Sequence, residues 1–244
     1  MRLFLSDEQW GETYGKVRTM TTAEFFAAYF SHHGVAIYAS LAVLFAVLGA
    51  FTATNWMQVV LPPVLVLIAY PLIEFTVHKY ILHNRTFYKH RETAAFWRRV
   101  HYDHHMNPNN LKVLFGALWT TLPLVLGLAL PIGYLTLGVG GAFVAASAGL
   151  VAFMGYEFFH CAAHLPVRFE SPMMQRLRRH HALHHFHAES GNYGIATDIA
   201  DKLLHTGYDG AGEMPKSPTV NNLGYTEEEA RRYPWVAELD RQPS

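Results

Sequence analysis

The sequence predicts an all-α protein that crosses a membrane, and three observations support this prediction. Apolar residues make up 51% of the 244 residues and are concentrated in long runs. Lysine and arginine are absent from 34–77 and from 113–159, and each interval is long enough for two membrane helices of about 20 residues. Histidines cluster directly beside these runs. We therefore expect a polytopic membrane protein with four transmembrane helices and a cytosolic helical cap that carries a histidine-rich site for two metal ions.

Residues 1–33 are expected to form an N-terminal cytosolic or interfacial segment. Thr21-x-x-Glu24 is a capping box, and the aromatic residues after it predict a short helix along the bilayer surface. His32 and His33 follow that helix. They share no ligand spacing with the other histidines, so we expect them at the wet membrane interface.

Four apolar runs predict the membrane spans. The expected spans are 34–53, 56–77, 113–131 and 134–158. They pair into two hairpins, and Pro131-Ile132-Gly133 marks the turn of the second one. Between the hairpins, a basic segment predicts a helix from about 92 to 106 that Pro108 ends.

The chain is expected to divide into a membrane domain, 34–210, and a polar C-terminal tail, 211–244, to which we assign no chemistry. Each hairpin returns the chain to the face it left, so all histidine motifs are expected on one face. Lysine and arginine occur only in segments on that face, which the positive-inside rule assigns to the cytosol together with both termini. The membrane would be a bacterial inner membrane or the endoplasmic reticulum, depending on the source.

Four histidine motifs accompany the apolar runs: His-x4-His, His-x2-His-His, His-x3-His and a second His-x2-His-His. Residues i, i+3 and i+4 share one face of a helix. Imidazoles gathered this way beside apolar sequence predict metal ligands, because unpaired polar groups there would be costly. The ten candidate ligands are His78, His83, His101, His104, His105, His160, His164, His181, His184 and His185.

Two histidines next to the last motif remain open as members of the site. His180 stands four residues before His184, and His187 could support the ligands. On a regular helix the five-residue step from His78 to His83 turns about 140°, so we expect the helix to break or unwind between them.

The number of histidines favours iron over zinc. Zinc hydrolases commonly use three ligands with a nearby carboxylate base, as in His-Glu-x-x-His, and that motif is missing. Ten imidazoles exceed what one ion can coordinate, whereas two ions with four or five each would use them all. We therefore expect two Fe ions, with Zn as a possible substitute in purified protein, and no catalytic residue beyond the metal centre.

Acidic residues near the motifs are expected in supporting roles. Glu74 and Glu157 lie shortly before His78 and His160, and we hypothesise that both accept hydrogen bonds from ligand imidazoles. A protonated or interfacial carboxyl is the alternative. Asp103 is expected to pair with Arg99, one helical turn before it.

Composition excludes several other classes of protein. The formal net charge is zero and the basic residues form no long run, so no nucleic-acid partner is expected. Cys161 is the only cysteine, which rules out an intrachain disulfide, and we expect it to have a packing role. The N-terminus has no cleavable signal peptide, so insertion should depend on the internal spans.

The order of the four motifs resembles the fatty acid hydroxylase / sterol desaturase superfamily. Two stretches, from Glu74 to His83 and from His184 to Thr206, are similar to its fatty acid 2-hydroxylase branch. The resemblance covers about 70–210 and places the family's ligands on the ten histidines given above. It implies a non-haem di-iron monooxygenase that uses O2 to hydroxylate an unactivated C–H bond of a lipid. Electrons are expected from a separate donor such as cytochrome b5 or ferredoxin.

The substrate and the outcome of the reaction stay open at this stage. The closest motifs favour an acyl chain of a fatty acid or sphingolipid-type lipid. A sterol, carotenoid or other lipid, and desaturation in place of hydroxylation, are alternatives within the superfamily. A non-enzymatic membrane protein that binds or transports metal is a further alternative. Transport favours ligands in the middle of the spans, whereas these histidines gather at one face.

Overall fold

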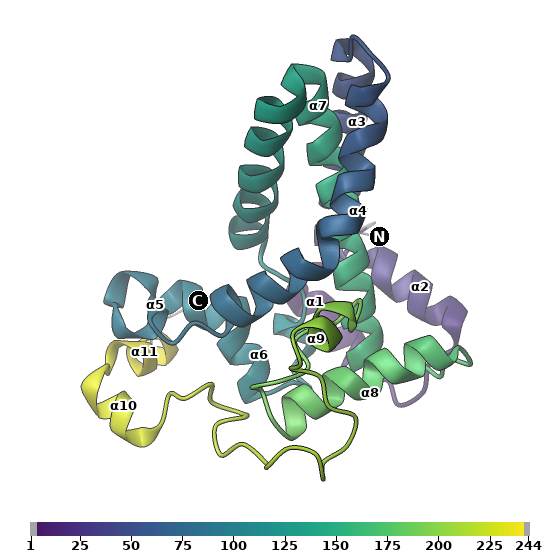
Figure 1. The fold of residues 1–244 in the computed structure, drawn as a ribbon. Coiled ribbons are helices and arrows are strands. Elements are labelled where there is room, and N and C mark those ends of the chain that lie inside the picture. Colours follow the sequence, from purple (N-terminus) through teal and green to yellow (C-terminus); the bar gives the residue numbers. More distant parts are fainter. Residues whose placement is uncertain (1–3, 242–244) are drawn as a thin grey trace.

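The fold is entirely helical within residues 4–241, the part of the chain that the computed structural model describes (Figure 1). The α-helices are α1 (Asp7–Tyr14), α2 (Thr22–Ser31), α3 (His33–Thr52), α4 (Met57–Val77), α5 (Arg91–Trp97), α6 (Asp103–Met106), α7 (Leu118–His164), α8 (Pro172–Phe186), α9 (Ile199–Leu203), α10 (Glu227–Arg232) and α11 (Trp235–Glu238). Two π-helical segments are η1 (His78–Leu82) and η3 (Arg98–Tyr102), and three 3-10 turns are η2 (Phe87–Lys89), η4 (Leu111–Val113) and η5 (Leu239–Arg241).

Three helical stretches are long and apolar enough to cross a membrane. They cover His33–Thr52, Met57–Lys89 and Leu111–His164. The third contains α7, which reverses direction at Gly138, so that Figure 1 shows it as two antiparallel arms. A Cβ atom on Gly149 would lie 3.4 Å from side chains of Val125 and Ala129, which shows how closely the arms pack.

The prediction of a turn at Pro131-Ile132-Gly133 is wrong, because the chain reverses direction at Gly138. Gly138 has φ of 70°, a conformation open mainly to glycine. The carbonyl of Leu137 next to it accepts a hydrogen bond of 2.7 Å from Gln58 Nε2 of α4, so the bend does not leave this group unpaired. Pro131 instead continues the first arm of α7, as proline can in a membrane helix.

The apolar helices pack around α7 and expose large side chains on their outer surfaces. Both α3 and α4 lie against α7. Phe51, Leu67 and Leu135 are 85%, 75% and 82% exposed. Water would make such a surface unfavourable, whereas lipid would cover it without penalty. The fold is therefore that of a membrane protein.

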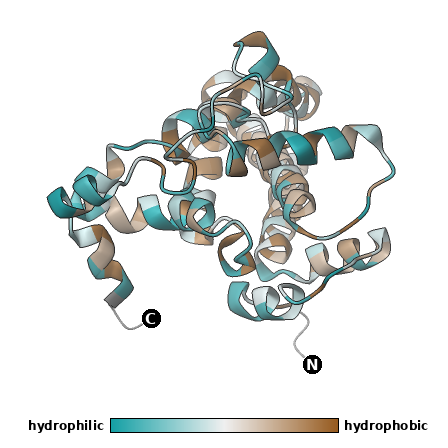
Figure 2. Cartoon of the chain, turned by 90° about the horizontal axis from the view of Figure 1, so that it is seen from below, coloured by the Kyte–Doolittle hydropathy of each residue, from teal (hydrophilic) through white to brown (hydrophobic). Residues whose placement is uncertain are grey.

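The remaining helices form a cap at one end of the apolar helices. Seen from this end (Figure 2), hydrophilic residues are spread over the cap. Its core joins the N-terminal helices to the chain after α7, with Trp10, Phe25, Leu165 and Val167 fully buried. The expected capping box at the start of α2 is present.

His32 does not lie in a wet interface, contrary to expectation. It is buried, and its Nε2 lies 2.9 Å from Asp7 Oδ1. Its ring stacks on Phe115 with centroids 3.8 Å apart. His33 is partly buried, with Nδ1 3.1 Å from the carbonyl oxygen of Leu5. Both histidines therefore fasten the N-terminal segment to the cap.

The expected helix at about 92–106 is present as three contiguous segments, α5, the π-helical η3 and α6. The π-helical turn moves the side-chain pairing by one residue, because it bonds i to i+5. Asp103 consequently pairs with Arg98 at 2.9 Å and not with Arg99. Arg99 pairs instead with Asp7 at 2.9 Å, which ties α1 to the histidine-bearing segment.

Candidate metal centre

All ten candidate histidines converge at the junction of the cap and the apolar helices. They form two groups of five, and within each group the candidate ligand atoms lie within 4.8 Å of one another. The first group contains His78, His83, His101, His105 and His184. The second group contains His104, His160, His164, His181 and His185. The four motifs, which are far apart in the sequence, thus meet in one place.

Each His-x2-His-His motif contributes histidines to both groups. On α8, His184 belongs to the first group, whereas His181 and His185 belong to the second. On the other motif, His104 belongs to the second group and its neighbour His105 to the first. Residues i, i+3 and i+4 cover a broad arc of the helix surface, so their rings can reach two neighbouring points.

A π-helical turn brings His78 and His83 together. The amide of His83 donates a 3.1 Å hydrogen bond to the carbonyl of His78, five residues earlier. A π-helix has more residues per turn than an α-helix, so a five-residue step returns close to the same face. The two ring centroids are 4.9 Å apart. The expected unwinding between these residues is confirmed.

Backbone carbonyls orient three rings of the first group. The Nδ1 atoms of His78, His105 and His184 lie 2.5, 2.8 and 2.7 Å from the carbonyl oxygens of Tyr193, Val220 and Gly191, respectively. A carbonyl only accepts hydrogen bonds, so Nδ1 must carry the proton in each ring. The Nε2 atoms of these three imidazoles then present lone pairs.

The Nε2 atoms of the first group crowd around a common point. His101 Nε2 lies 2.9 Å from that of His78, 3.0 Å from that of His105 and 3.1 Å from that of His83. Nitrogen lone pairs that face one another at this distance repel, and a single proton between them could form hydrogen bonds with only a few of them. A cation at this point would satisfy all of them, so the donor set fits a metal ion.

The second group has the same convergence, but backbone carbonyls support fewer of its rings, and only those of Leu114 and Pro108 lie near His160 and His164. The Nε2 atoms of His104 and His160 are 3.0 Å apart, and those of His164 and His181 are 2.9 Å apart. Among the described residues, the buried Nδ1 atoms of four members find no hydrogen-bond partner. These members are His104, His160, His181 and His185.

The two groups are direct neighbours. The ring centroids of His105, in the first group, and His185, in the second, are 4.2 Å apart. Two ions held by these groups would therefore lie side by side and could act on one bound molecule.

Burial keeps the cap histidines in their neutral, metal-binding form. Removal from water lowers the pKa of His184 to about 4, despite the hydrogen bond to Gly191, which raises it. Burial also lowers the pKa of His101 and His181 well below the ordinary value, and neighbouring imidazoles lower it further. Neutral imidazole is the form that binds metal.

The hypothesis that Glu74 and Glu157 accept hydrogen bonds from ligand imidazoles is wrong. Oε1 of Glu74 accepts hydrogen bonds of 2.7 Å from the amides of Ile195 and Ala196. Oε1 of Glu157 accepts a 2.8 Å bond from the amide of Gly116. Both buried carboxyls bind backbone amides through Oε1, whereas Oε2 of Glu74 has no hydrogen-bond partner among the described residues.

The residues that sequence left open lie outside both groups. His180 Nε2 is 3.2 Å from Asp201 Oδ2, and His187 Nε2 is 2.6 Å from the carbonyl oxygen of Met214. Cys161 is buried in the apolar core of the cap, as its expected packing role requires.

A third cluster, Asp7 with His32 and His33, also brings possible ligand atoms together. Its carboxylate is already paired with Arg99, and both ring nitrogens of His32 have hydrogen-bond partners. This cluster is therefore an ion-pair network and not a metal site.

Sequence reasoning missed the backbone carbonyls behind the first group. Gly191 and Tyr193 lie in the loop after α8, and Val220 lies in the tail to which we assigned no chemistry. A carbonyl is present in every residue, so no residue type could signal this role.

An apolar cavity leads from between the membrane helices to the histidines. Its volume is about 620 Å³. Residues of α4 and of both arms of α7 line it, including Leu65 and Leu128. At the cap end the lining includes two histidines of the first group and two of the second. They are His78, His101, His104 and His160. A long apolar molecule could therefore reach both groups.

Comparisons with known proteins find a matching family. A family model described as fatty acid hydroxylase matches residues 63–206. The fatty acid 2-hydroxylase of Macaca fascicularis is 26% identical over 141 residues, which cover 55% of this chain and 36% of that protein. The dihydroceramide fatty acyl 2-hydroxylase FAH2 of Arabidopsis thaliana is 26% identical over 154 residues, which cover 59% of this chain and 62% of that protein.

A solved structure shares the fold. Full-length scs7p, of which only the hydroxylase domain is visible, superposes with a TM-score of 0.63 at 19% sequence identity. The superposition covers 75% of this chain and 67% of that one. The matched part of this chain spans less than two thirds of either fatty acyl 2-hydroxylase.

Proposed function

Because the chain belongs to the fatty acid hydroxylase family, we propose that it is a membrane di-iron oxygenase that hydroxylates a lipid acyl chain. The substrate would be a fatty acid or a sphingolipid-type lipid, and O2 would supply the oxygen atom. One observation carries this proposal: a single apolar cavity is lined by histidines of both groups. That arrangement would bring an acyl chain within reach of two ions at once.

The cavity suits an extended hydrocarbon chain. Its lining runs from Pro62 on α4 to His78 at the start of η1, and sixteen helical steps correspond to about 24 Å. Most of its wall is apolar, so it would bind methylene groups and exclude water from the oxidising site. Sterols and carotenoids are also apolar, and the experiment below separates them from acyl lipids.

Two irons would supply the chemistry of O2 activation and C–H cleavage when bound. The residues of this chain would have three tasks. The ten histidines hold the ions, with five imidazoles for each. Carbonyls behind the first group fix the orientation of its rings. The apolar lining positions the carbon to be oxidised beside both ions.

The proposed topology has four membrane crossings, formed by α3, α4 and the two arms of α7. The cap, the metal centre and both termini would face the cytosol, since Lys79, Arg85 and Lys89 follow α4 at the cap end. A separate redox protein such as cytochrome b5 or ferredoxin would deliver electrons there. The basic cytosolic residues favour a donor with an acidic surface.

Lipid analysis of cells with and without the protein tests the proposed reaction. We expect one class of acyl lipid to gain the mass of one oxygen atom, with label from 18O2 in the product. The purified protein should contain about two irons per chain. A labelled sterol or carotenoid, a product that has only lost two hydrogens, or transport of metal without lipid oxidation would contradict the proposal.

A cavity variant tests where the acyl chain binds. Ala152 lines the cavity, and Val151 next to it is 58% exposed on the outside. Ala152→Phe should lower turnover of long acyl chains at least about tenfold, because the ring would occupy space that the chain needs. The matched Val151→Phe should retain activity, and both variants should retain iron. Equal activity of Ala152→Phe and the wild type would place the chain elsewhere.

A further inference from the structure

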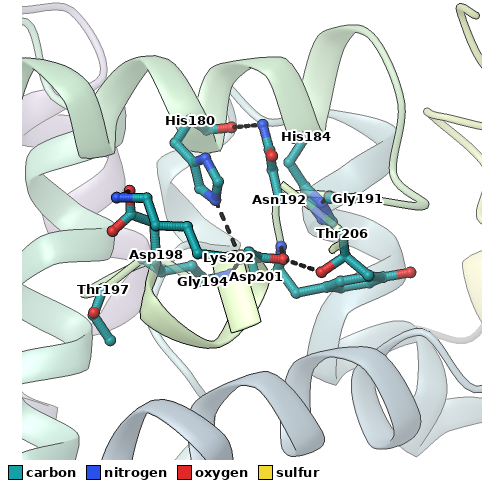
Figure 3. A network of polar contacts seen from close by, with 12 residues as sticks. His180, His184, Gly191, Asn192, Gly194, Thr197, Asp198, Asp201, Lys202 and Thr206 are labelled. Carbon is teal, nitrogen blue, oxygen red and sulfur yellow. Dashed lines mark hydrogen bonds and ion pairs between the residues drawn. The ribbon is translucent and has the colours of Figure 1, made fainter. Parts of the chain in front are cut away.

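We propose that Asp201 is a positioning residue for the first histidine group alone, acting through the loop that follows α8. The inference rests on the proposed function, since it assumes that the histidine groups hold metal. Asp201 holds the loop, the loop presents two carbonyl oxygens, and these carbonyls orient His78 and His184. Figure 3 shows the network around Asp201.

Asp201 is fully buried on α9 and accepts four hydrogen bonds. Two come from loop amides, those of Tyr193 at 3.0 Å and Gly194 at 2.6 Å. The others come from Thr206 Oγ1 at 2.6 Å and His180 Nε2 at 3.2 Å. Burial raises the pKa of Asp201, but these hydrogen bonds outweigh it and lower the pKa to about 2. The carboxylate is therefore ionised and makes strong hydrogen bonds.

The loop held in this way delivers the carbonyls to the histidines. The amide of Tyr193 donates a hydrogen bond to Asp201, and the carbonyl of Tyr193 accepts one from His78 Nδ1. The carbonyl of Gly191, two residues earlier, accepts a hydrogen bond from His184 Nδ1. Asn192 between them donates to the carbonyls of His180 and Tyr208, which fixes the loop against α8.

These contacts determine which nitrogen of each ring is free. A carbonyl at Nδ1 holds the proton there and directs the Nε2 lone pair into the first group. If the loop shifted, the two rings could rotate or change tautomer, and their lone pairs would no longer converge. Asp201 therefore acts on the metal through the rings and touches neither the ion nor the substrate.

The effect should be confined to the first group. The hydrogen bonds of Asp201 reach the loop, Thr206 and His180, none of which belongs to the second group. Four buried Nδ1 atoms of the second group have no hydrogen-bond partner among the described residues. The backbone groups that approach His160 and His164 belong to Leu114 and Pro108, which lie outside this loop.

Asp198, close to Asp201 in the sequence, provides a matched control. Asp198 is similarly buried and precedes Asp201 by three residues. It pairs with Arg176 at 3.1 Å and Lys202 at 2.9 Å and makes no side-chain contact with the loop amides. Asp198→Asn therefore removes a buried charge from the same region without releasing the loop.

The test is a Co2+ titration of the metal-stripped, full-length protein, followed by the visible absorption of bound cobalt and by competition with a chelator. We expect the wild type to bind about two equivalents. Asp201→Asn should weaken one site by roughly 10–100-fold, the usual cost of removing an outer support of a ligand, and leave the other unchanged. Asp198→Asn should bind both equivalents as the wild type does.

Thr206→Val provides a milder test that does not depend on the folding of Asp201→Asn. It removes one of the four hydrogen bonds to the carboxylate and should weaken the same cobalt site to a smaller extent. Wild-type affinity at both sites in Asp201→Asn, or in Thr206→Val if the first variant does not fold, would overturn the inference. Equal weakening of both sites would overturn it as well.

These outcomes are distinct from failure of the proposed function. A wild-type protein that binds no metal would refute the di-iron proposal itself. A wild type that binds two equivalents, together with an Asp201→Asn variant that binds them equally well, would refute only the role of Asp201.

Discussion

The two histidine groups have the same composition but are supported differently. Each contains five imidazoles. In the first group, three rings are fixed from behind by the carbonyls of Gly191, Tyr193 and Val220. In the second group, four buried Nδ1 atoms have no partner among the described residues. The first group is therefore oriented mainly by the backbone before metal binds. The second is oriented mainly by packing and the neighbouring rings, with only the carbonyls of Leu114 and Pro108 near two of its rings.

This difference predicts that the two metal sites respond separately to mutation. A backbone support acts at a distance, through a loop, so residues far from the ion can alter the first site. The second site has fewer such supports, and its affinity should depend mainly on its own ligands.

The largest effect is expected from removing one ligand of each group on the same helix. His184→Ala should cost about one metal equivalent at the first site, and His181→Ala about one at the second. Both should reduce lipid hydroxylation below detection, because the proposed reaction needs two irons. Iron per chain and product per chain are measured by mass spectrometry. His90, which is exposed and belongs to neither group, provides the control His90→Ala with both metals and full activity.

Loss of metal from the same site in His184→Ala and His181→Ala would contradict the division into two separate metal sites. Cobalt absorption distinguishes the two sites when each variant is titrated separately. Identical residual spectra would show that the ten histidines form one undivided centre.

A smaller effect is expected from the two buried carboxyls. Glu74→Leu would leave the amides of Ile195 and Ala196 without their acceptor, next to the loop that supports the first group. A buried amide without a partner costs about 1–3 kcal/mol, so we expect a looser loop and about tenfold weaker metal binding at the first site. Glu157→Leu releases only the amide of Gly116 and should leave both metal affinities unchanged.

Chelator competition measures these affinities, and thermal unfolding serves as the control for general damage. Both leucine variants should lower the melting temperature. Weaker metal binding in Glu157→Leu, at either site, would show that stability alone governs the affinity.

The smallest expected difference between the groups concerns pH, because a change of pH should affect both groups to the same extent. Burial lowers the pKa of six cap histidines, three from each group. In the unfolded chain these imidazoles take up protons below about pH 6.5, whereas in the folded protein they stay neutral. The metal-free protein should therefore lose stability as the pH falls from about 7 to 5. Asp201, with a pKa of about 2, is ionised throughout this window and contributes no change.

The melting temperature of the metal-free protein, measured at several pH values, checks this prediction. His184→Gln and His181→Gln each remove one such imidazole and should reduce the pH dependence to the same extent. A melting temperature independent of pH would mean that the folded protein takes up as many protons as the unfolded chain.

Much of the site could be predicted from sequence, because the relevant signals are local. The spacing of His160 and His164 on a helix, and the positions of the motifs beside apolar runs, are sufficient to place ten imidazoles at one end of the spans. Their division into two groups could not be predicted. Whether His104 or His105 points to a given ion depends on how a π-helical turn rotates the helix, and spacing alone does not encode that rotation.

The errors have similar physical causes. Pro131 and Gly133 are strong turn signals in soluble chains, but an apolar helix accommodates both, and the reversal occurs at Gly138, where the backbone has a positive φ. Glu74 was expected to contact an imidazole because it lies one helical turn from His78. Its real partners, Ile195 and Ala196, lie more than a hundred residues later in the sequence.

The π-helical turn at His78–Leu82 makes the length of this segment unusually critical. Surface loops generally accept an inserted or missing residue, because the chain on either side can adjust. Here, one added residue would put six steps between His78 and His83, and the extra step would swing the ring of His83 by about 100° away from its partners. Evolution could therefore vary the side chains of this segment far more freely than add residues to it.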